Sequence, residues 1–174
     1  GIVFKRIDLD RDNIVYPTFS NVSNTSLNTT ISNEFGVKVS TIEHLMGALF
    51  IIGIDNALIE IDSEEVPILD GSAKEFVEKI LLTDLVFSSK PIKIIKINKK
   101  IEFQDGPRYA SIEPSKLSLD MEFELNYNNL IIGNQKNKVN VYNDEIKDIL
   151  KTRTFCLYPD IEAIRKHSLA KVCR

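Results

Sequence analysis

The sequence lacks several features that define particular protein classes. It has no tryptophan, and its two cysteines, Cys156 and Cys173, have neither the number nor the spacing of a disulfide framework or a zinc finger. The longest apolar run, Leu45–Ile54, is about half of the ~20 residues that a membrane helix needs. We therefore expect a protein of a reducing compartment, the cytoplasm, without stable membrane insertion.

A strong charge of one sign is also missing. The net charge is −3, and the lysines are scattered through the chain instead of forming a basic block. Nucleic-acid binding normally leaves a clustered basic surface. We therefore expect no nucleic-acid partner.

The stretch Asn21–Thr30 carries three N-glycosylation sequons, at Asn21, Asn24 and Asn28. The chain shows no export signal, because Gly1–Arg6 already alternates like a strand. We interpret the stretch as a polar loop. An exported, glycosylated binding domain is the alternative that the sequons alone motivate.

The first half of the chain alternates between strand and helix patterns. Residues 2–8 and 57–61 read as strands. Ser40 and Glu43 fit a capping box, and apolar residues at helical spacing then predict a helix over about 41–51, closed by Gly53. A second capping box at Ser72–Glu75 predicts another helix, whose apolar side comprises Phe76, Val77, Ile80 and Leu81.

The residue pattern of the second half is typical of a β-sheet. Ser88–Pro91 is the best domain boundary, and residues 92–103 and 108–113 form a predicted hairpin around Asp105-Gly106-Pro107. Strict alternation over 117–125 predicts a strand with one buried and one wet face. Helices are expected to return at 144–151 and 160–167. The predicted fold class is α+β.

Glu43 and His44, at the start of a buried helix, are the strongest catalytic candidates among the residue types. The helix N-terminus favours a neutral imidazole, the form that binds a metal, and a neighbouring carboxylate is the usual general base for amide hydrolysis. A plainer interpretation is that Glu43 serves the capping box and His44 is structural. One histidine is not a zinc site, which needs about three protein ligands.

Three further residues have weaker chemical signals. His167 lies in a polar stretch that we expect to be exposed, and Cys156 lacks a histidine placed to activate it. Asp70 lies in a tight proline- and glycine-containing loop, where an Asx turn or a helix cap explains it better than acid catalysis.

Several motifs, in order and in register, resemble the UDP-3-O-acyl-N-acetylglucosamine deacetylase family of lipid A biosynthesis. They are the opening Gly1–Leu9, Ser40–Met46, Gly53–Asn56, Val66–Ala73, Thr152–Phe155 and Asp160–Glu162. The resemblance implies two similar two-layer α/β sandwich domains, 1–88 and 91–174, with their helix layers packed against each other. The chain starts without methionine and stops within a motif, so we expect truncation at both ends and an incomplete second domain.

The resemblance also implies a zinc-dependent amide hydrolysis, with the metal in the cleft between the domains. His44 would be a zinc ligand and Glu43 the general base for the attacking water. Thr154 would place its hydroxyl near the developing oxyanion. The remaining His and Asp ligands and a catalytic histidine would lie beyond Arg174, so we expect the 174-residue piece to be inactive alone.

The implied substrate is a UDP-linked, 3-O-acylated N-acetylglucosamine bound by a monomer. Phe155 would line the substrate site, and Leu157 and Ile161 the hydrophobic passage for the acyl chain. Cys156 departs from the glycine that is usual in the family at this position. The alternative is a degenerate, non-catalytic relative that binds a nucleotide sugar or a protein partner.

Overall fold

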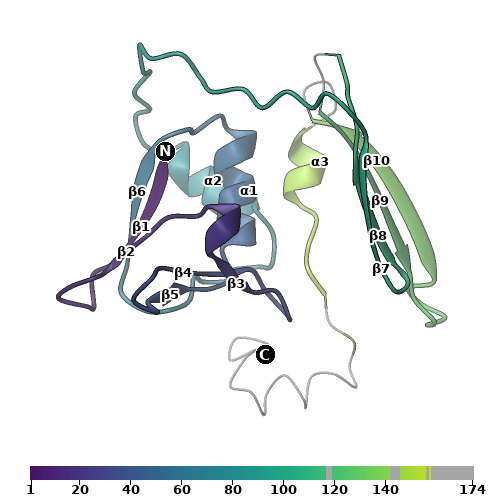
Figure 1. Cartoon of the computed structure of the whole chain (residues 1–174), viewed down its shortest axis with the longest axis horizontal. Helices are drawn as coiled ribbons and strands as arrows, with labels where there is room; N and C mark the ends of the chain where they lie inside the picture. The colour runs from purple at the N-terminus through teal and green to yellow at the C-terminus, as the bar shows by residue number, and fades with distance from the viewer. Residues whose placement is uncertain (117–118, 142–145, 156, 158–174) are drawn as a thin grey trace. The chain divides into compact units, whose positions relative to one another are not determined.

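The computed structural model describes residues 1–116, 119–141, 146–155 and 157 (Figure 1). They fall into two compact units. The first combines Gly1–Leu85 with the described residues from Lys147 onward, and the second is Val86–Ile146. Helices and several small sheets are both present, so the α+β class is confirmed. The predicted domains 1–88 and 91–174, with their facing sandwich layers, stay a prediction.

The first unit is built on a three-stranded sheet. Its central strand β1 (Ile2–Arg6) pairs antiparallel with β2 (Ile14–Val15) and parallel with β6 (Ala57–Ile61). The strands predicted at 2–8 and 57–61 are therefore confirmed, the first of them ending earlier. A parallel pair needs a long crossover, and the crossover from β1 to β6 contains a second sheet and a helix.

The second sheet is small and antiparallel, in the order β3-β4-β5. A 3-10 turn, η1 (Phe19–Asn21), leads into β3 (Val22–Asn24), which is followed by β4 (Thr30–Ser32) and β5 (Lys38–Val39). Ile31 and Val39 pair across β4 and β5 and are buried. The stretch Asn21–Thr30, predicted as a polar loop, therefore contains the short strand β3, which forms one edge of this sheet.

Two helices lie on one side of the β2-β1-β6 sheet, α1 (Glu43–Ile51) and α2 (Lys74–Ile80) (Figure 1). Leu45 and Leu49 of α1 are buried against the sheet, and Phe76 and Ile80 of α2 pack against the same core. The core is completed by residues of both sheets and of the segments around α1: Phe4, Val15, Ile31, Val39, Ile42, Ile61 and Val66. Leu81, predicted on the apolar side of α2, is instead 56% exposed.

Gly53 closes α1 as predicted. Its φ is +72°, and its amide donates to the carbonyl of Phe50, while the amide of Ile54 donates to the carbonyl of Leu49. This pair of bonds is a Schellman motif, which satisfies carbonyls at the helix end and suits a residue without Cβ. Ile54 and Leu49 also meet in the core, so the motif ties the helix end to the sheet.

Neither predicted capping box forms. α2 has Ala73 at its N-cap without a side-chain cap, although the amide of Lys74 donates to the hydroxyl of Ser72 at 3.2 Å. That hydroxyl also donates to Asp70, because Ser72 belongs to the preceding turn and not to the helix. The α1 box fails for a related reason, given with the site below.

The second unit consists of two hairpins. β7 (Ile101–Asp105) pairs with β8 (Arg108–Ile112), as the Asp-Gly-Pro turn predicts, and β9 (Asp120–Asn126) pairs with β10 (Asn134–Asn140). Both hairpins are largely exposed on both faces, so the predicted buried face of 117–125 is wrong for its described residues. A two-stranded hairpin with no covering layer in its unit buries neither face.

The long strand predicted over 92–103 is also wrong in its first part. Residues 91–98 have no regular secondary structure, and Ile94 and Ile95 are 83% and 89% exposed. An alternating pattern forms a strand only when another strand accepts its backbone hydrogen bonds, and none in the described residues pairs here. Among its described residues, the helix predicted at 144–151 is found as α3 (Ile146–Leu150), and the one predicted at 160–167 lies outside the described residues.

Across the described ranges, every helix is too short or too polar to cross a membrane.

Arg6 connects β1 to β5 and also forms a partly buried ion pair with Asp8. The Arg6 guanidinium donates to both carboxylate oxygens of Asp8, at 2.7 and 2.6 Å, and to the carbonyl of Lys38 at 2.9 Å. These hydrogen bonds from Arg6 lower the pKa of Asp8 below its ordinary value. A carboxyl with a lowered pKa in the folded state adds stability above its unfolded pKa, and this is lost as pH falls through the lowered value.

We therefore expect Asp8→Asn to lower the urea midpoint at pH 7, and the gap from the wild type to close below about pH 4. Asp10→Asn is the matched control, because Asp10 is exposed and its carboxylate makes no hydrogen bond to a described residue. Urea unfolding at pH 7 and pH 3 measures both variants. An undiminished gap at pH 3 contradicts the linkage to Asp8.

Candidate functional site

Glu43 and His44 begin α1, and both are half-buried. The predicted capping box is wrong, because Ser40 forms a β-bridge with Glu65 and Thr41 then turns the chain with φ +57°. The N-cap is Ile42, which offers no side-chain cap. The carboxylate of Glu43 is therefore not used to cap its own helix.

Glu43 is held instead by the polar loop before β4. Its Oε2 accepts a hydrogen bond from the backbone amide of Thr29 at 3.0 Å. The carbonyl of Thr29 in turn accepts from the amide of Ile42 at 3.4 Å. The loop and the start of α1 are thus tied by two bonds, and one of them orients the carboxylate.

A chain of side-chain hydrogen bonds fixes this loop. Thr30 donates its hydroxyl to Asn28 at 3.0 Å, Asn28 donates to the hydroxyl of Thr41 at 3.0 Å, and Thr41 donates to Glu65 at 2.9 Å. A β-branched residue with positive φ is rare, and such strain persists only where the surroundings hold it. Thr41 is buried within this chain of bonds. The sequon residue Asn28 therefore has a structural role beside Glu43.

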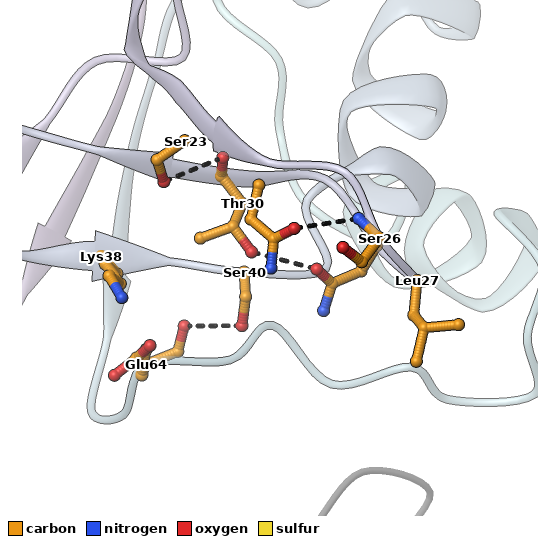
Figure 2. Close-up of a pocket in the computed structure, with 9 residues that line it drawn as sticks. Ser23, Ser26, Leu27, Thr30, Lys38, Ser40 and Glu64 are labelled. Atoms are coloured by element: carbon orange, nitrogen blue, oxygen red, sulfur yellow. Dashed lines mark hydrogen bonds between the residues drawn. The ribbon is translucent and has the colours of Figure 1, made fainter. Parts of the chain in front are cut away.

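A polar pocket of about 260 Å³ lies next to this network (Figure 2). Hydroxyl and amide groups dominate its wall, with Lys38 and Glu64 as the charged side chains. Figure 2 shows Ser40 bonded to the backbone of Glu64 and Ser23 bonded to the backbone of Thr30. Most polar groups of the pocket wall form hydrogen bonds with one another. These hydrogen bonds help to hold the loop that binds Glu43.

His44 follows Glu43 in the first turn of α1 and is the only histidine among the described residues. One imidazole nitrogen on a helix start has the donor chemistry of a zinc ligand. Within the ranges that the structure covers, no three His, Cys, Asp or Glu side chains gather closely enough to hold a metal. The described residues therefore hold no assembled metal site, and the assignment of His44 as a zinc ligand stays a prediction.

Thr154 lies in the first unit, in a segment that contacts the turn preceding α2. Its amide donates to the carbonyl of Gly71 at 2.9 Å, while the residue itself is exposed. Among the described residues its hydrogen bonding involves Gly71 and neither Glu43 nor His44. The structure thus brings Glu43 and His44 together and anchors Thr154 separately.

The predicted substrate-binding residues are only partly described. Phe155 is 49% exposed and Leu157 is half-buried. Ile161 lies outside the described residues, as do Cys156, His167 and Cys173. The roles of Phe155, Leu157 and Ile161 stay predictions.

Asp70 forms the predicted Asx turn. Its Oδ1 accepts from the amide of Ser72 at 3.1 Å and from the hydroxyl of Ser72 at 2.6 Å. Its Oδ2 lies 3.1 Å from Nη2 of Arg153. The hydrogen bond from the Ser72 hydroxyl, and then the guanidinium of Arg153, lower the pKa of Asp70. Sequence reasoning missed the contact with Arg153, since no local pattern marks a pair 83 residues apart.

Comparison with known proteins identifies the family. The profile of the UDP-3-O-acyl N-acetylglycosamine deacetylase family matches residues 1–173. Relatives named UDP-3-O-acyl-N-acetylglucosamine deacetylase are 40% identical over 171 residues in Nautilia profundicola, 37% over 174 in Saccharophagus degradans and 38% over 173 in Shewanella denitrificans. Each match covers 98% of this chain but only 56–57% of the relative, so the chain spans a little over half of their length. On the strength of a profile match along nearly its whole length, the chain belongs to the UDP-3-O-acyl-N-acetylglucosamine deacetylase family.

Proposed function

We propose that this chain contributes the Glu-His part of a zinc-dependent deacetylase of lipid A biosynthesis, acting in the cytoplasm. The substrate is a UDP-linked, 3-O-acylated N-acetylglucosamine, and the reaction is the committed step of that pathway. The family match over residues 1–173 carries this proposal. The half-buried Glu43-His44 pair at the start of α1 supports it.

In the proposed reaction, water attacks the carbonyl carbon of the N-acetyl group. The C–N bond breaks, releasing acetate and a free amine. Glu43 takes the proton from the water, and the amide of Thr29 keeps its carboxylate aimed. His44 would be one ligand of a zinc ion, which would supply Lewis acidity toward the carbonyl and the attacking water. The remaining ligands are not among the described residues.

Thr154 has the second proposed role. Its hydroxyl donates to the oxygen that becomes negative as water adds, which is where a preplaced donor lowers the barrier most. The hydroxyl suits this role, because it makes no hydrogen bond to a described residue while the backbone of Thr154 is tied to Gly71. Phe155 lines the substrate, and Leu157 and Ile161 contact the acyl chain, each buried CH₂ of which contributes about 0.8 kcal/mol.

The test is the zinc content of the native protein, purified from its own source without chelators. We expect about one zinc ion per chain. We expect His44→Ala to weaken zinc binding by more than about 100-fold, because changing even a group that only supports a ligand costs 10–100-fold. His167→Ala is the matched control, as the other histidine of the chain.

Metal analysis by mass spectrometry and competition with a chromogenic chelator give both quantities. Stoichiometric zinc with unchanged affinity in His44→Ala contradicts the assignment of His44. A folded native protein that takes up no zinc contradicts the enzyme and favours the non-catalytic relative.

A further inference from the structure

The turn before α2 is rigid and strained. Leu69 and Gly71 have φ of +52° and +79°, and Gly71 and Ser72 are buried. A leucine in the left-handed region persists only where the surroundings determine it. The amide of Gly71 donates to the carbonyl of Ile68 at 3.0 Å and closes the turn around Leu69, and two hydrogen bonds from Ser72 to Oδ1 of Asp70 fix the residues that follow.

The outer side of this turn binds the segment that carries Thr154. Arg153 donates to Oδ2 of Asp70 at 3.1 Å, and the amide of Thr154 donates to the carbonyl of Gly71 at 2.9 Å. Two consecutive residues are thus bonded to two consecutive residues of the turn. A Cβ on Gly71 would lie 3.4 Å from Cγ2 of Thr154, which is ordinary van der Waals contact, so the φ of +79° and not the lack of space favours glycine here.

The two oxygens of Asp70 have separate partners. Oδ1 builds the turn through Ser72, and Oδ2 faces Arg153. The side chain of Arg153 is 65% exposed, and an ion pair so accessible to water contributes little to stability. The pair is therefore better suited to orienting a segment than to stabilising the fold.

We propose that Asp70 and Arg153 are positioning residues for the reaction, and that they hold Thr154 against the Gly71 carbonyl so that its hydroxyl points to the substrate. This rests on the proposed role of Thr154. The turn leads directly into α2, which packs against α1, the helix of Glu43 and His44. The backbone of Thr154 is therefore held in position relative to α1 and α2, and α1 carries Glu43, the proposed base.

Asp70→Asn separates the two functions of the carboxylate, because asparagine keeps Oδ1 for Ser72 and replaces Oδ2 by an amide that cannot accept from Arg153. Arg153→Gln breaks the same contact without touching the turn. Lys74→Gln is the matched control, since it removes an exposed ion pair with Glu78 on α2.

Amide hydrogen exchange by NMR and steady-state kinetics are measured on the native protein. We expect either variant to speed exchange at the Thr154 amide about threefold and to lower kcat about tenfold or more, with KM within about twofold. The double variant should match the single ones, because both break one contact. Lys74→Gln should change none of these quantities.

Unchanged exchange at Thr154 in both variants overturns the proposal, as does a raised KM with unchanged kcat. Equal effects of Lys74→Gln also overturn it. Failure of the proposed function gives a different result, which is full activity of Thr154→Val or His44→Ala. The two failures are therefore distinguishable.

Discussion

For the deacetylation proposed above, we expect Glu43→Gln to lower kcat by about 10²–10⁴-fold, the usual contribution of a general base. Glutamine keeps an oxygen that accepts the hydrogen bond from the Thr29 amide. The start of α1 therefore keeps its structure while the side chain loses its ability to take a proton. Release of acetate from the N-acetylated substrate, measured at saturation, gives kcat.

Glu75→Gln is the control for this variant. Glu75 is also an acidic, half-buried residue in the first turn of a helix, α2. It experiences the same kind of helix dipole without the contact to Thr29, so we expect activity close to that of the wild type. Comparable losses in both variants mean that Glu43 acts through helix stability, and the assignment of a base is then wrong.

Phe4→Ala destabilises the first unit by about 3–5 kcal/mol. Phe4 is the largest fully buried side chain, with an exposed fraction of 0%. Its backbone lies opposite Val15 in β2 and Ile59 in β6. Truncation thus leaves a cavity where both strand pairs meet. Such a loss is a large share of the ~5–15 kcal/mol that holds a typical domain together.

Urea unfolding followed by circular dichroism measures the change. Leu58→Ala is the matched control, because Leu58 is a strand residue of the same sheet, in β6, but is 61% exposed. We expect a change within about 0.5 kcal/mol there. Equal losses of unfolding free energy in Phe4→Ala and Leu58→Ala would contradict the placement of Phe4 in the core.

Local patterns predicted the elements whose partners are close in sequence or whose periodicity is strong. The helix α1, the strand β6 and the β7-β8 hairpin fall in this group. The capping of α1 was predicted wrongly, because the backbone of Ser40 bonds to Glu64 and Val66, far along the chain. A local motif cannot show that a distant segment already uses one of its members.

The same reasoning applies to the site. Residue types and helix position made Glu43 and His44 candidates beside a plainer structural interpretation, whereas the predicted roles of Thr154 and Phe155 came only from the resemblance. The amide of Thr29 is a backbone donor, and no residue type marks a backbone donor. The first part of the strand predicted over 92–103 does not form, because alternation records a side-chain pattern and does not report whether a partner strand exists.

The parallel pairing of β1 with β6 affects the order of events during synthesis. Ile2 lies opposite Ala57, so β1 is synthesised well before its parallel neighbour β6. At ~5–20 residues per second, the delay is roughly 3–11 s. During that interval Phe4 has β2, the β3-β4-β5 sheet and α1 as neighbours of its unit, and its parallel partner strand β6 is still missing. The nascent chain therefore exposes an apolar strand for seconds. That time is long enough for a ribosome-associated chaperone to bind the strand.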